Sequence, residues 1–380
     1  MTAVRVLVVD DSVVARRLIA DSLGRAPGIE VAGTASDGSI ALTRIAELSP
    51  DAVVLDIEMP RMDGLETLER IRQTRPDLPV VMFSTLTERG ARITLDALDK
   101  GASDYVTKPS ALRGETVSGV VEQVLAPKLL ALAKARATRA HGPAAARTNG
   151  AAPSSATMSS NPPPMPAKPI QRPRVLLPLR AVLIASSTGG PTALAEVIPR
   201  LPADFPLPVL VVQHMPPVFT KCLAERLESQ SKLRVREAQG NEPVRPGTVW
   251  IAPGARHLEV AQEGDQIVTR LGDGPPENSC RPAADVLFRS AVKVYGGGLL
   301  AVVMTGMGRD GFAGTTEVLG AGGRSIVQSG PTCTVWGMPR AVEQAGLADQ
   351  VVPLNDLASA IIQTARPGMV IGGEPRAWRD

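Results

Sequence analysis

Aromatic residues are scarce in this chain: Phe, Tyr and Trp together make up 3% of its 380 residues. The chain therefore offers few of the aromatic platforms on which proteins stack single-stranded nucleic acid. Basic and acidic side chains nearly balance, at a net charge of +3, so no basic patch for DNA is predicted either. We expect no nucleic-acid partner.

Cysteine is equally scarce, and Cys222, Cys280 and Cys333 lie far apart with no CxxC spacing. This excludes a zinc site of the common kind and a disulfide framework, so we expect the cysteines to be packing or surface residues. No apolar run approaches the roughly 20 residues of a membrane helix. The segment Met1–Arg5 enters a strand at once, unlike a signal peptide. We expect a cytoplasmic protein without direct membrane insertion.

What the first part of the chain does contain is a regular alternation of apolar strands and amphipathic helices. The predicted strands are Val4–Val9, Ile29–Ala32, Ala52–Leu55, Val80–Phe83 and Asp104–Val106. A helical pattern follows each strand. Repeated strand–helix units of this size favour an α/β fold with a doubly wound parallel sheet of the flavodoxin-like kind.

Polar side chains stand at the ends of these strands: Asp10 and Asp11 after the first, Asp56 after the third, Ser84 after the fourth and Lys108 after the fifth. The carboxyl ends of parallel strands meet at one edge of the sheet. Three carboxylates gathered there suit a hard cation such as Mg²⁺. A lysine and a hydroxyl beside them suit the oxygens of a phosphoryl group. A solvated rim with acids placed by chance is the alternative.

With these residues, and with the run Leu55–Gly64 and the pair Lys108-Pro109, the first part resembles a receiver domain of two-component signalling. The resemblance implies phosphorylation by a sensor histidine kinase. The residues that it assigns to the site are the phosphate acceptor Asp56, the Mg²⁺ ligands Asp11, Asp56 and the Glu58 carbonyl with Asp10 beside them, and the phosphate contacts Ser84 and Lys108.

Between the two α/β parts, the sequence turns Ala-rich and then Pro- and Ser-rich. Few side chains there could build a core, and the stretch is far longer than an ordinary loop, so it is predicted to be a linker. The predicted division is a receiver domain at 1–134, a linker at 135–174 and a catalytic domain at 175–370.

The third part resumes the α/β alternation, with Leu258–Ala261 and Gln266–Leu271 expected to pair as a ribbon and Asn355 expected to cap the last helix. Three reactive side chains follow its apolar strands: Ser187, His214 and Asp310. Serine needs a base within hydrogen-bond reach, histidine is the natural base near neutral pH, and a carboxylate fixes the histidine tautomer.

The order Ser, His, Asp differs from those of the common triad families, and no GxSxG elbow is present, so a convergent triad is the interpretation that fits. Alternatives remain at this point. His214 could be an ordinary strand-end histidine, Asp310 could cap the helix after it, and the run Ser187–Gly190 could be a phosphate nest.

The third part also resembles the catalytic domain of chemotaxis protein-glutamate methylesterases. The motifs that carry the resemblance are Ser186–Gly190, Gln213–Pro217, Thr305–Gly311, Pro253-Gly254 before His257, and Ser279–Asp285. One departure is Ala185, which stands where the family usually has glycine.

The resemblance implies a Rossmann-like domain that hydrolyses glutamate methyl esters on methylated chemoreceptors, and deamidates glutamines, without a cofactor. Ser187 would attack, His214 would act as base, Asp310 would orient it, and backbone N–H groups near Thr188 or in the Met307-Gly308 loop would hold the oxyanion. The unphosphorylated receiver would cover the triad edge. The competing hypothesis is a non-catalytic, phosphorylation-dependent signalling adaptor.

Overall fold

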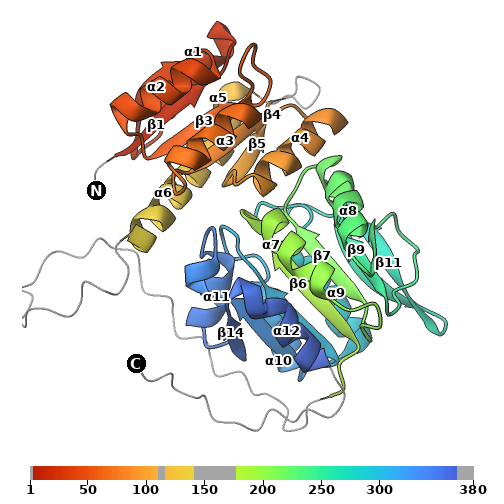
Figure 1. The fold of residues 1–380 in the computed structure, drawn as a ribbon. Helices are drawn as coiled ribbons and strands as arrows, with labels where there is room; N and C mark the ends of the chain where they lie inside the picture. Colours follow the sequence, from red (N-terminus) through yellow and green to blue (C-terminus); the bar gives the residue numbers. More distant parts are fainter. Residues whose placement is uncertain (1–2, 110–115, 141–176, 366–380) are drawn as a thin grey trace, which may run out of the picture.

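A computed structural model describes residues 3–109, 116–140 and 177–365 of the chain, and it contains two separate parallel sheets (Figure 1). The first sheet has the strand order β2-β1-β3-β4-β5. Its strands are β1 (Val4–Val9), β2 (Ile29–Ala35), β3 (Ala52–Asp56), β4 (Val80–Ser84) and β5 (Asp104–Thr107). This is the flavodoxin-like order, so the predicted α/β fold of the first part is confirmed.

The helices of this part begin where short polar side chains can accept hydrogen bonds from free backbone N–H groups. They are α1 (Val13–Arg25), α2 (Gly38–Leu48), α3 (Gly64–Thr74) and α4 (Glu88–Asp99), capped by Ser12, Asp37, Asp63 and Thr87 respectively. Each cap satisfies one donor that the first helical turn leaves unpaired. The caps therefore fix where the chain turns at the carboxyl edge of the sheet.

A long helical segment follows the last strand of the first sheet. It consists of α5 (Val117–Val120), a π-helical turn (Val121–Leu125) and α6 (Ala126–Ala140). Helix α6 continues past residue 135, where the composition predicts the linker to begin. The rest of that segment lies outside the described residues.

The second sheet has the order β14-β13-β12-β6-β7-β9-β8, and all of its strand pairs are parallel. Its strands are β6 (Ala181–Ser186), β7 (Val209–Gln213), β8 (Arg234–Glu237), β9 (Thr248–Ile251), β12 (Leu299–Val303), β13 (Arg324–Gln328) and β14 (Gln350–Val352). The predicted ribbon is also present, as the antiparallel pair β10 (His257–Glu263) and β11 (Gln266–Gly272). The second α/β domain is thus a doubly wound sheet as predicted.

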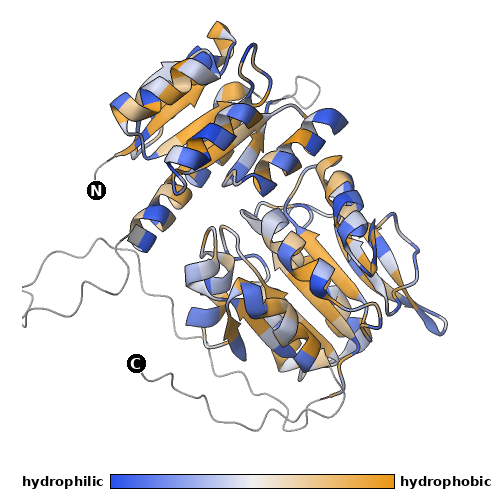
Figure 2. Ribbon diagram, viewed as in Figure 1, coloured by the Kyte–Doolittle hydropathy of each residue, from blue (hydrophilic) through white to orange (hydrophobic). Residues whose placement is uncertain are grey.

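Apolar side chains of the central strands alternate between two cores, one on each face of the second sheet. Val182 and Ile184 belong to one cluster, whereas Ala181 and Leu183 belong to the other. Helices α7 (Gly190–Val197), α8 (Phe219–Gln230) and α12 (Leu354–Ala365) supply the first core, and α9 (Ala284–Tyr295), α10 (Phe312–Gly320) and α11 (Met338–Gln344) supply the second. Figure 2 shows the hydrophobic colour concentrated on the strands between these layers.

Two local predictions differ from the structure. Strand β8 was not predicted, because its sequence Arg234-Val235-Arg236-Glu237 is charged and buries only one side chain at the edge of the sheet. The expected cap Asn355 lies inside α12, which begins one residue earlier at Leu354. Neither difference moves the carboxyl edge of the sheet, where the reactive side chains lie.

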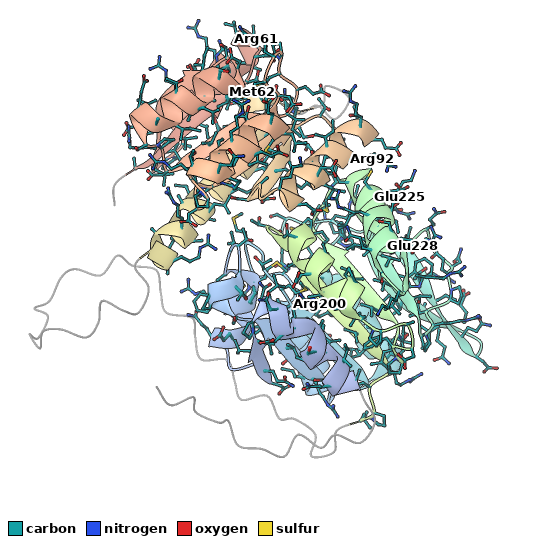
Figure 3. All side chains as sticks on the ribbon, viewed as in Figure 1. Arg61, Met62, Arg92, Arg200, Glu225 and Glu228 are labelled. Carbon is teal, nitrogen blue, oxygen red and sulfur yellow. The ribbon has the colours of Figure 1, made fainter. Side chains whose placement is uncertain are left out.

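The two domains pack against each other along one contiguous apolar cluster. Helix α4 lies against α8 and α7, and the ring of Tyr105 in β5 stacks on that of Phe219 at the start of α8, with centroids 4.7 Å apart. Charged pairs flank the stack, including Arg92 Nη2 with Glu225 Oε2 at 2.8 Å, which lie together at the α4–α8 junction in Figure 3. The first domain therefore sits over the helices that follow β6 and β7.

Candidate functional site

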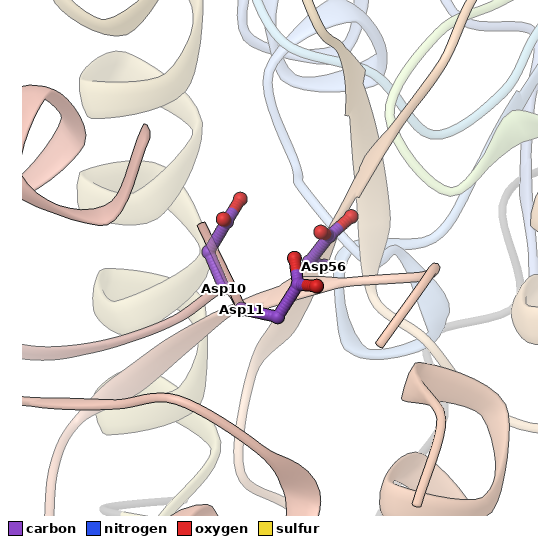
Figure 4. Close-up of side chains that lie close together, drawn as sticks. All are labelled: Asp10, Asp11 and Asp56. Atoms are coloured by element: carbon purple, nitrogen blue, oxygen red, sulfur yellow. The ribbon is translucent and has the colours of Figure 1, made fainter. Parts of the chain in front are cut away.

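The first domain gathers three carboxylates at its sheet edge. Oxygen atoms of Asp10, Asp11 and Asp56 all lie within 4.8 Å of one another (Figure 4). Asp10 and Asp56 are almost fully buried, at 1% and 2% exposed. The Lys108 ammonium lies 2.7 Å from Asp56 Oδ2 and 3.5 Å from Asp10 Oδ2. The structure thus brings together four of the residues predicted for the receiver site.

The chemistry of this cluster fits a hard divalent cation. Burial raises the pKa of Asp56 to about 6, although the Lys108 ammonium and a hydrogen bond from the Glu58 backbone act to lower it. Three carboxylates share the single nearby ammonium of Lys108, so the cluster keeps an excess of negative charge. Carboxylate oxygens are the ligands that Mg²⁺ prefers. The Glu58 carbonyl as a further ligand stays a prediction.

Ser84 lies at the same edge of the sheet, but its hydroxyl is hydrogen-bonded to other residues and not to the acidic cluster. Its hydroxyl donates to the Gly90 carbonyl at 3.3 Å and accepts from Thr94 Oγ1 at 2.7 Å. Both partners belong to α4, the helix that contacts the second domain. To contact a phosphoryl group, Ser84 would have to exchange these bonds for new ones.

In the second domain, the two serines at the end of β6 have different surroundings. Ser186 is fully buried and its hydroxyl donates to Gln213 Oε1 at 2.7 Å. Ser187 is half-buried, and its hydroxyl makes no hydrogen bond within the described part of the chain. The backbone carbonyl of Ser186 accepts from the N–H of His214 at 3.1 Å, which holds the ends of β6 and β7 together. Ser187 is therefore the serine left free to react.

Glycine is required on both sides of Ser187. A Cβ on Gly190 would lie 1.9 Å from Gln213 Oε1, and one on Gly306 would lie 2.8 Å from the Ser187 Cβ. The Ser187 N–H donates to the Thr305 carbonyl at 3.0 Å. The loop after β12 therefore lies directly against the serine.

Several backbone N–H groups near Ser187 have no acceptor among the residues that the structure describes. Those of Thr188, Met307 and Gly308 donate no hydrogen bond to any described residue. Helix α7 starts without a side-chain cap, because Gly189 at φ 76° precedes it. Unpaired N–H groups can hold the negative charge of a tetrahedral intermediate. That these three groups form an oxyanion hole stays a prediction.

His214 and Asp310 meet across the sheet edge. His214 Nε2 lies 2.7 Å from Asp310 Oδ2, with the two side chains 13% and 2% exposed. Because Nε2 faces the carboxylate, it carries a proton, and Nδ1 is the nitrogen that can take up and release a second one. The structure contains this pair but no hydrogen bond between Ser187 and His214 among the residues described.

Nδ1 faces a residue that the sequence did not single out for chemistry. Cys280 Sγ lies 3.4 Å from His214 Nδ1. The expectation that Cys280 is a packing or surface residue rather than a nucleophile stays a prediction. The signal available in the sequence was its place in the run Ser279–Asp285. His257, by contrast, bonds the Pro275 carbonyl and the Ala283 N–H and holds that loop in place.

The electrostatics of the pair favour an ion pair in the resting state. Burial acts to lower the pKa of His214, but the hydrogen bonds with Asp310 and Cys280 outweigh it and raise the pKa to about 9. His214 and the backbone N–H groups of Ala284 and Asp285 hold the pKa of Asp310 below its usual value, against its burial. Asp310 is therefore ionised throughout the neutral range.

Family models match both domains. Residues 6–114 match the response regulator receiver domain, and residues 182–361 match the CheB methylesterase domain. In the parts of the chain that the structure describes, no helix is both long and apolar enough to cross a membrane.

Similar proteins cover nearly the whole chain. A protein-glutamate methylesterase/protein-glutamine glutaminase of Trichodesmium erythraeum is 46% identical over 96% of this chain and 99% of its own length. One of the same name from Nocardioides sp. is 48% identical over 98% of this chain and 99% of its own. The crystal structure of the Thermotoga maritima CheB methylesterase catalytic domain matches 49% of this chain and 99% of that one, at 43% identity and a TM-score of 0.48.

The order of the two domains and the full-length similarity lead to one assignment. The chain belongs to the family of protein-glutamate methylesterases/protein-glutamine glutaminases, which are hydrolases, and it carries the receiver domain ahead of the esterase domain.

Proposed function

We propose that Ser187, His214 and Asp310 hydrolyse glutamate methyl esters on chemoreceptors and deamidate receptor glutamines. The observation that carries this proposal is the buried His214–Asp310 pair at the sheet edge where Ser187 stands unbonded. The enzymatic family assignment gives no support to the adaptor hypothesis. Release of methanol from methylated chemoreceptor, measured with the full chain, tests the proposal.

In this mechanism, Ser187 Oγ attacks the ester carbonyl while His214 Nδ1 takes the hydroxyl proton. The N–H groups of Thr188, Met307 and Gly308 are the donors available to the oxyanion. His214 then gives its proton to the departing methanol, and water releases the acyl group as glutamate. An amide carbonyl can follow the same course with ammonia as the leaving group, and neither course requires a cofactor.

Cys280 gives this mechanism a distinctive pH dependence. Since the base must be neutral, kcat/KM should rise about tenfold per pH unit below the His214 pKa of about 9 and level off above it. Cys280→Ala removes one of the contacts that raise this pKa, so the rising limb should move to lower pH. The rate at pH 7 should then increase, by roughly 2- to 10-fold.

The measurement is kcat/KM against pH for the wild type and Cys280→Ala, with Cys222→Ala as the matched control. Cys222 lies in α8 and does not touch His214. If the rising limb of the kcat/KM profile lies at the same pH in Cys280→Ala as in the wild type, the thiol does not influence the pKa of His214.

For the receiver, the proposal is that Asp56 accepts a phosphoryl group from a sensor histidine kinase. Asp11 and Asp56 would hold Mg²⁺ with the Glu58 carbonyl, and Asp10 would lie beside the ion. The ion would neutralise charge on the phosphoryl oxygens during transfer. Lys108 already lies 2.7 Å from Asp56 and would pair with the phosphoryl group once it forms.

Phosphorylation would act on the esterase through the face that joins the domains. The Tyr105–Phe219 stack places β5 against the start of α8, five residues after His214. Ser84 reaches the same face, because its hydroxyl is bonded to α4. If Ser84 turns toward a phosphoryl group, α4 loses two bonds that hold it in its present position. We therefore propose that the unphosphorylated receiver restricts access to Ser187.

The ion pairs of Arg226 give a direct test of this restriction. Arg226 Nη1 lies 2.6 Å from Asp96 Oδ1, and its Nη2 pairs with Asp99, so both pairs join α8 to α4. The carboxylates are about half exposed, so each pair is worth only about 0.2–1 kcal/mol. Arg226→Ala should raise the unphosphorylated rate roughly 2- to 10-fold, within the range of typical site-to-site coupling.

The comparison is methanol release with and without a small phosphodonor, using Arg234→Ala as control. Arg234 is an exposed arginine of β8 that forms no ion pair with the described residues of the receiver. An unphosphorylated rate equal to that of wild type in Arg226→Ala would contradict the restriction.

Three further points belong to the same proposal. The boundaries 1–134, 135–174 and 175–370 divide the chain into receiver, linker and esterase. The methylated chemoreceptors and the kinase are its partners, with no nucleic acid among them. The place of action is the cytoplasm.

A further inference from the structure

The carboxylate of Asp310 accepts hydrogen bonds from several groups besides His214. Its Oδ2 accepts from His214 Nε2 at 2.7 Å and from the Ala284 N–H at 2.6 Å. Its Oδ1 accepts from the N–H groups of Asp285 and Gly311 and from Asn278 Nδ2, each at 3.0 Å. Asn278 is thus the one side-chain amide that bonds the carboxylate, within the part of the chain that the structure describes.

The same amide nitrogen bonds a second buried acid. Asn278 Nδ2 also donates to Asp285 Oδ2 at 2.9 Å, and Asp285 is 2% exposed. Asp285 Oδ1 accepts from the Gly314 N–H at 2.6 Å, which fixes the carboxylate between α9 and α10. A primary amide has two N–H groups, so one can go to each acid. Without it, two carboxylates would face each other in a site with little water.

The loop that carries Asn278 is built to present this amide. Glu277 and Cys280 exchange two backbone hydrogen bonds, at 3.0 and 2.9 Å. Asn278 and Ser279 between them adopt left-handed conformations, with φ of 52° and 62°. Glu277 is anchored in turn by Arg289 of α9, whose Nη1 lies 2.8 Å from Glu277 Oε1. The side chains of Glu277 and Asn278 therefore tie the loop to α9, the helix that carries Asp285.

We propose that Asn278 and Asp285 are positioning residues of the catalytic triad: the Asn278 amide joins the Asp310 and Asp285 carboxylates and so fixes the Asp310 oxygen that orients His214. The inference rests on the proposed function, because it assumes that Asp310 serves His214 in ester hydrolysis. Neither residue touches the ester. Both act through Asp310, so their loss should lower kcat and leave KM nearly unchanged.

The first test is Asn278→Ala in the full-length protein, with Asn241→Ala as its control. Asn241 also has a left-handed backbone, at φ 73°, but it is exposed and bonds Arg270 far from the triad. Loss of one hydrogen bond to a charged group should lower kcat about 10- to 100-fold, with KM changed by less than about twofold. The control should keep wild-type kinetics.

The pH profile separates positioning from a general structural role. The titratable groups that face His214 are Asp310, before α10, and Cys280, in the loop before α9; Asp285 lies behind Asp310. A displaced Asp310 stabilises the imidazolium less, so the rising limb of kcat/KM should move to lower pH in Asn278→Ala. A fall in kcat with an unmoved limb would overturn the proposal, as would an unchanged kcat.

The second test is the double variant Asn278→Ala with Asp285→Asn. Asp285→Asn alone should also lower kcat, because its NH₂ would face either the Asn278 amide or the Gly314 N–H, and both of these are donors. In the double variant, the charge that faces Asp310 is gone, so kcat should be several-fold higher than in Asn278→Ala. A double variant whose losses simply multiply would overturn the proposal. If Asn278→Ala folds poorly because its two carboxylates repel each other, the double variant should fold better, so the comparison can still be made.

Ser187→Ala, run in the same methanol-release assay, distinguishes this inference from the function on which it rests. If Ser187→Ala retains wild-type hydrolysis, the proposed function fails. If Ser187→Ala is inactive and Asn278→Ala has wild-type kcat and an unmoved limb, only the positioning role fails.

Discussion

Replacing Ser187 by alanine is expected to lower the turnover of methylated chemoreceptor by about 10⁶-fold, the usual cost of removing the nucleophile of a triad. The fold should survive, because the Ser187 hydroxyl makes no hydrogen bond to the described residues and alanine fits the same space. Methanol release under saturating substrate, with and without a phosphodonor, measures the effect. The phosphodonor should accelerate only the wild type.

Ser186→Ala is the matched control for this variant. It removes a buried hydroxyl that bonds Gln213 Oε1, so it should lower stability by about 1 kcal/mol while hydrolysis continues. If Ser186→Ala is inactive and Ser187→Ala is active, the nucleophile has been assigned to the wrong serine. If neither protein nor the wild type releases methanol, the adaptor hypothesis returns.

Replacing Asp310 by asparagine is expected to lower turnover by about 10⁴-fold. The two oxygens of the Asp310 carboxylate accept five hydrogen bonds in total. In the asparagine variant, an NH₂ group replaces one of these oxygens and therefore faces N–H donors, whichever way the amide is turned. If the NH₂ faces His214, it stabilises the tautomer with the proton on Nδ1. That nitrogen then donates a hydrogen bond and cannot take the proton of Ser187.

The control for this variant is Asp273→Asn, at an exposed acid that pairs with Arg256 at 2.8 Å. It should retain wild-type turnover at every pH. The residual activity of Asp310→Asn should also increase at high pH, where hydroxide can replace the missing base. Turnover within tenfold of wild type in Asp310→Asn would remove Asp310 from the mechanism.

The sequence predicted the strands and the polar residues at their ends because both signals are local. An apolar run such as Ala181–Ile184 needs burial on both faces, and a parallel strand in a doubly wound sheet provides it. Once the strands are assigned, the convergence of Asp10, Asp56 and Lys108 follows from topology alone. The same logic places Ser187 and His214 side by side, since β6 and β7 are neighbours.

The edge strand β8 was not predicted, because its local hydrophobic signal is too weak. Only Val235 of its four residues is fully buried, so the alternation that marks a strand is too short to see among charged side chains. Asn355 was assigned as a helix cap from its residue type, which does not reveal that the chain turns into α12 one residue earlier.

By itself, the sequence predicted the two α/β domains and the acidic cluster, because both depend on the spacing of side chains along short segments. The resemblance of its motifs to a known family, rather than their spacing, assigned Ser187, His214 and Asp310 to the proposed triad. Only the tertiary structure decided that Cys280 contacts His214, that Asn278 joins Asp285 to Asp310, and that Tyr105 stacks on Phe219. These contacts join segments that no periodicity relates. They arise from how a loop folds back over the sheet edge and how two separate cores pack together.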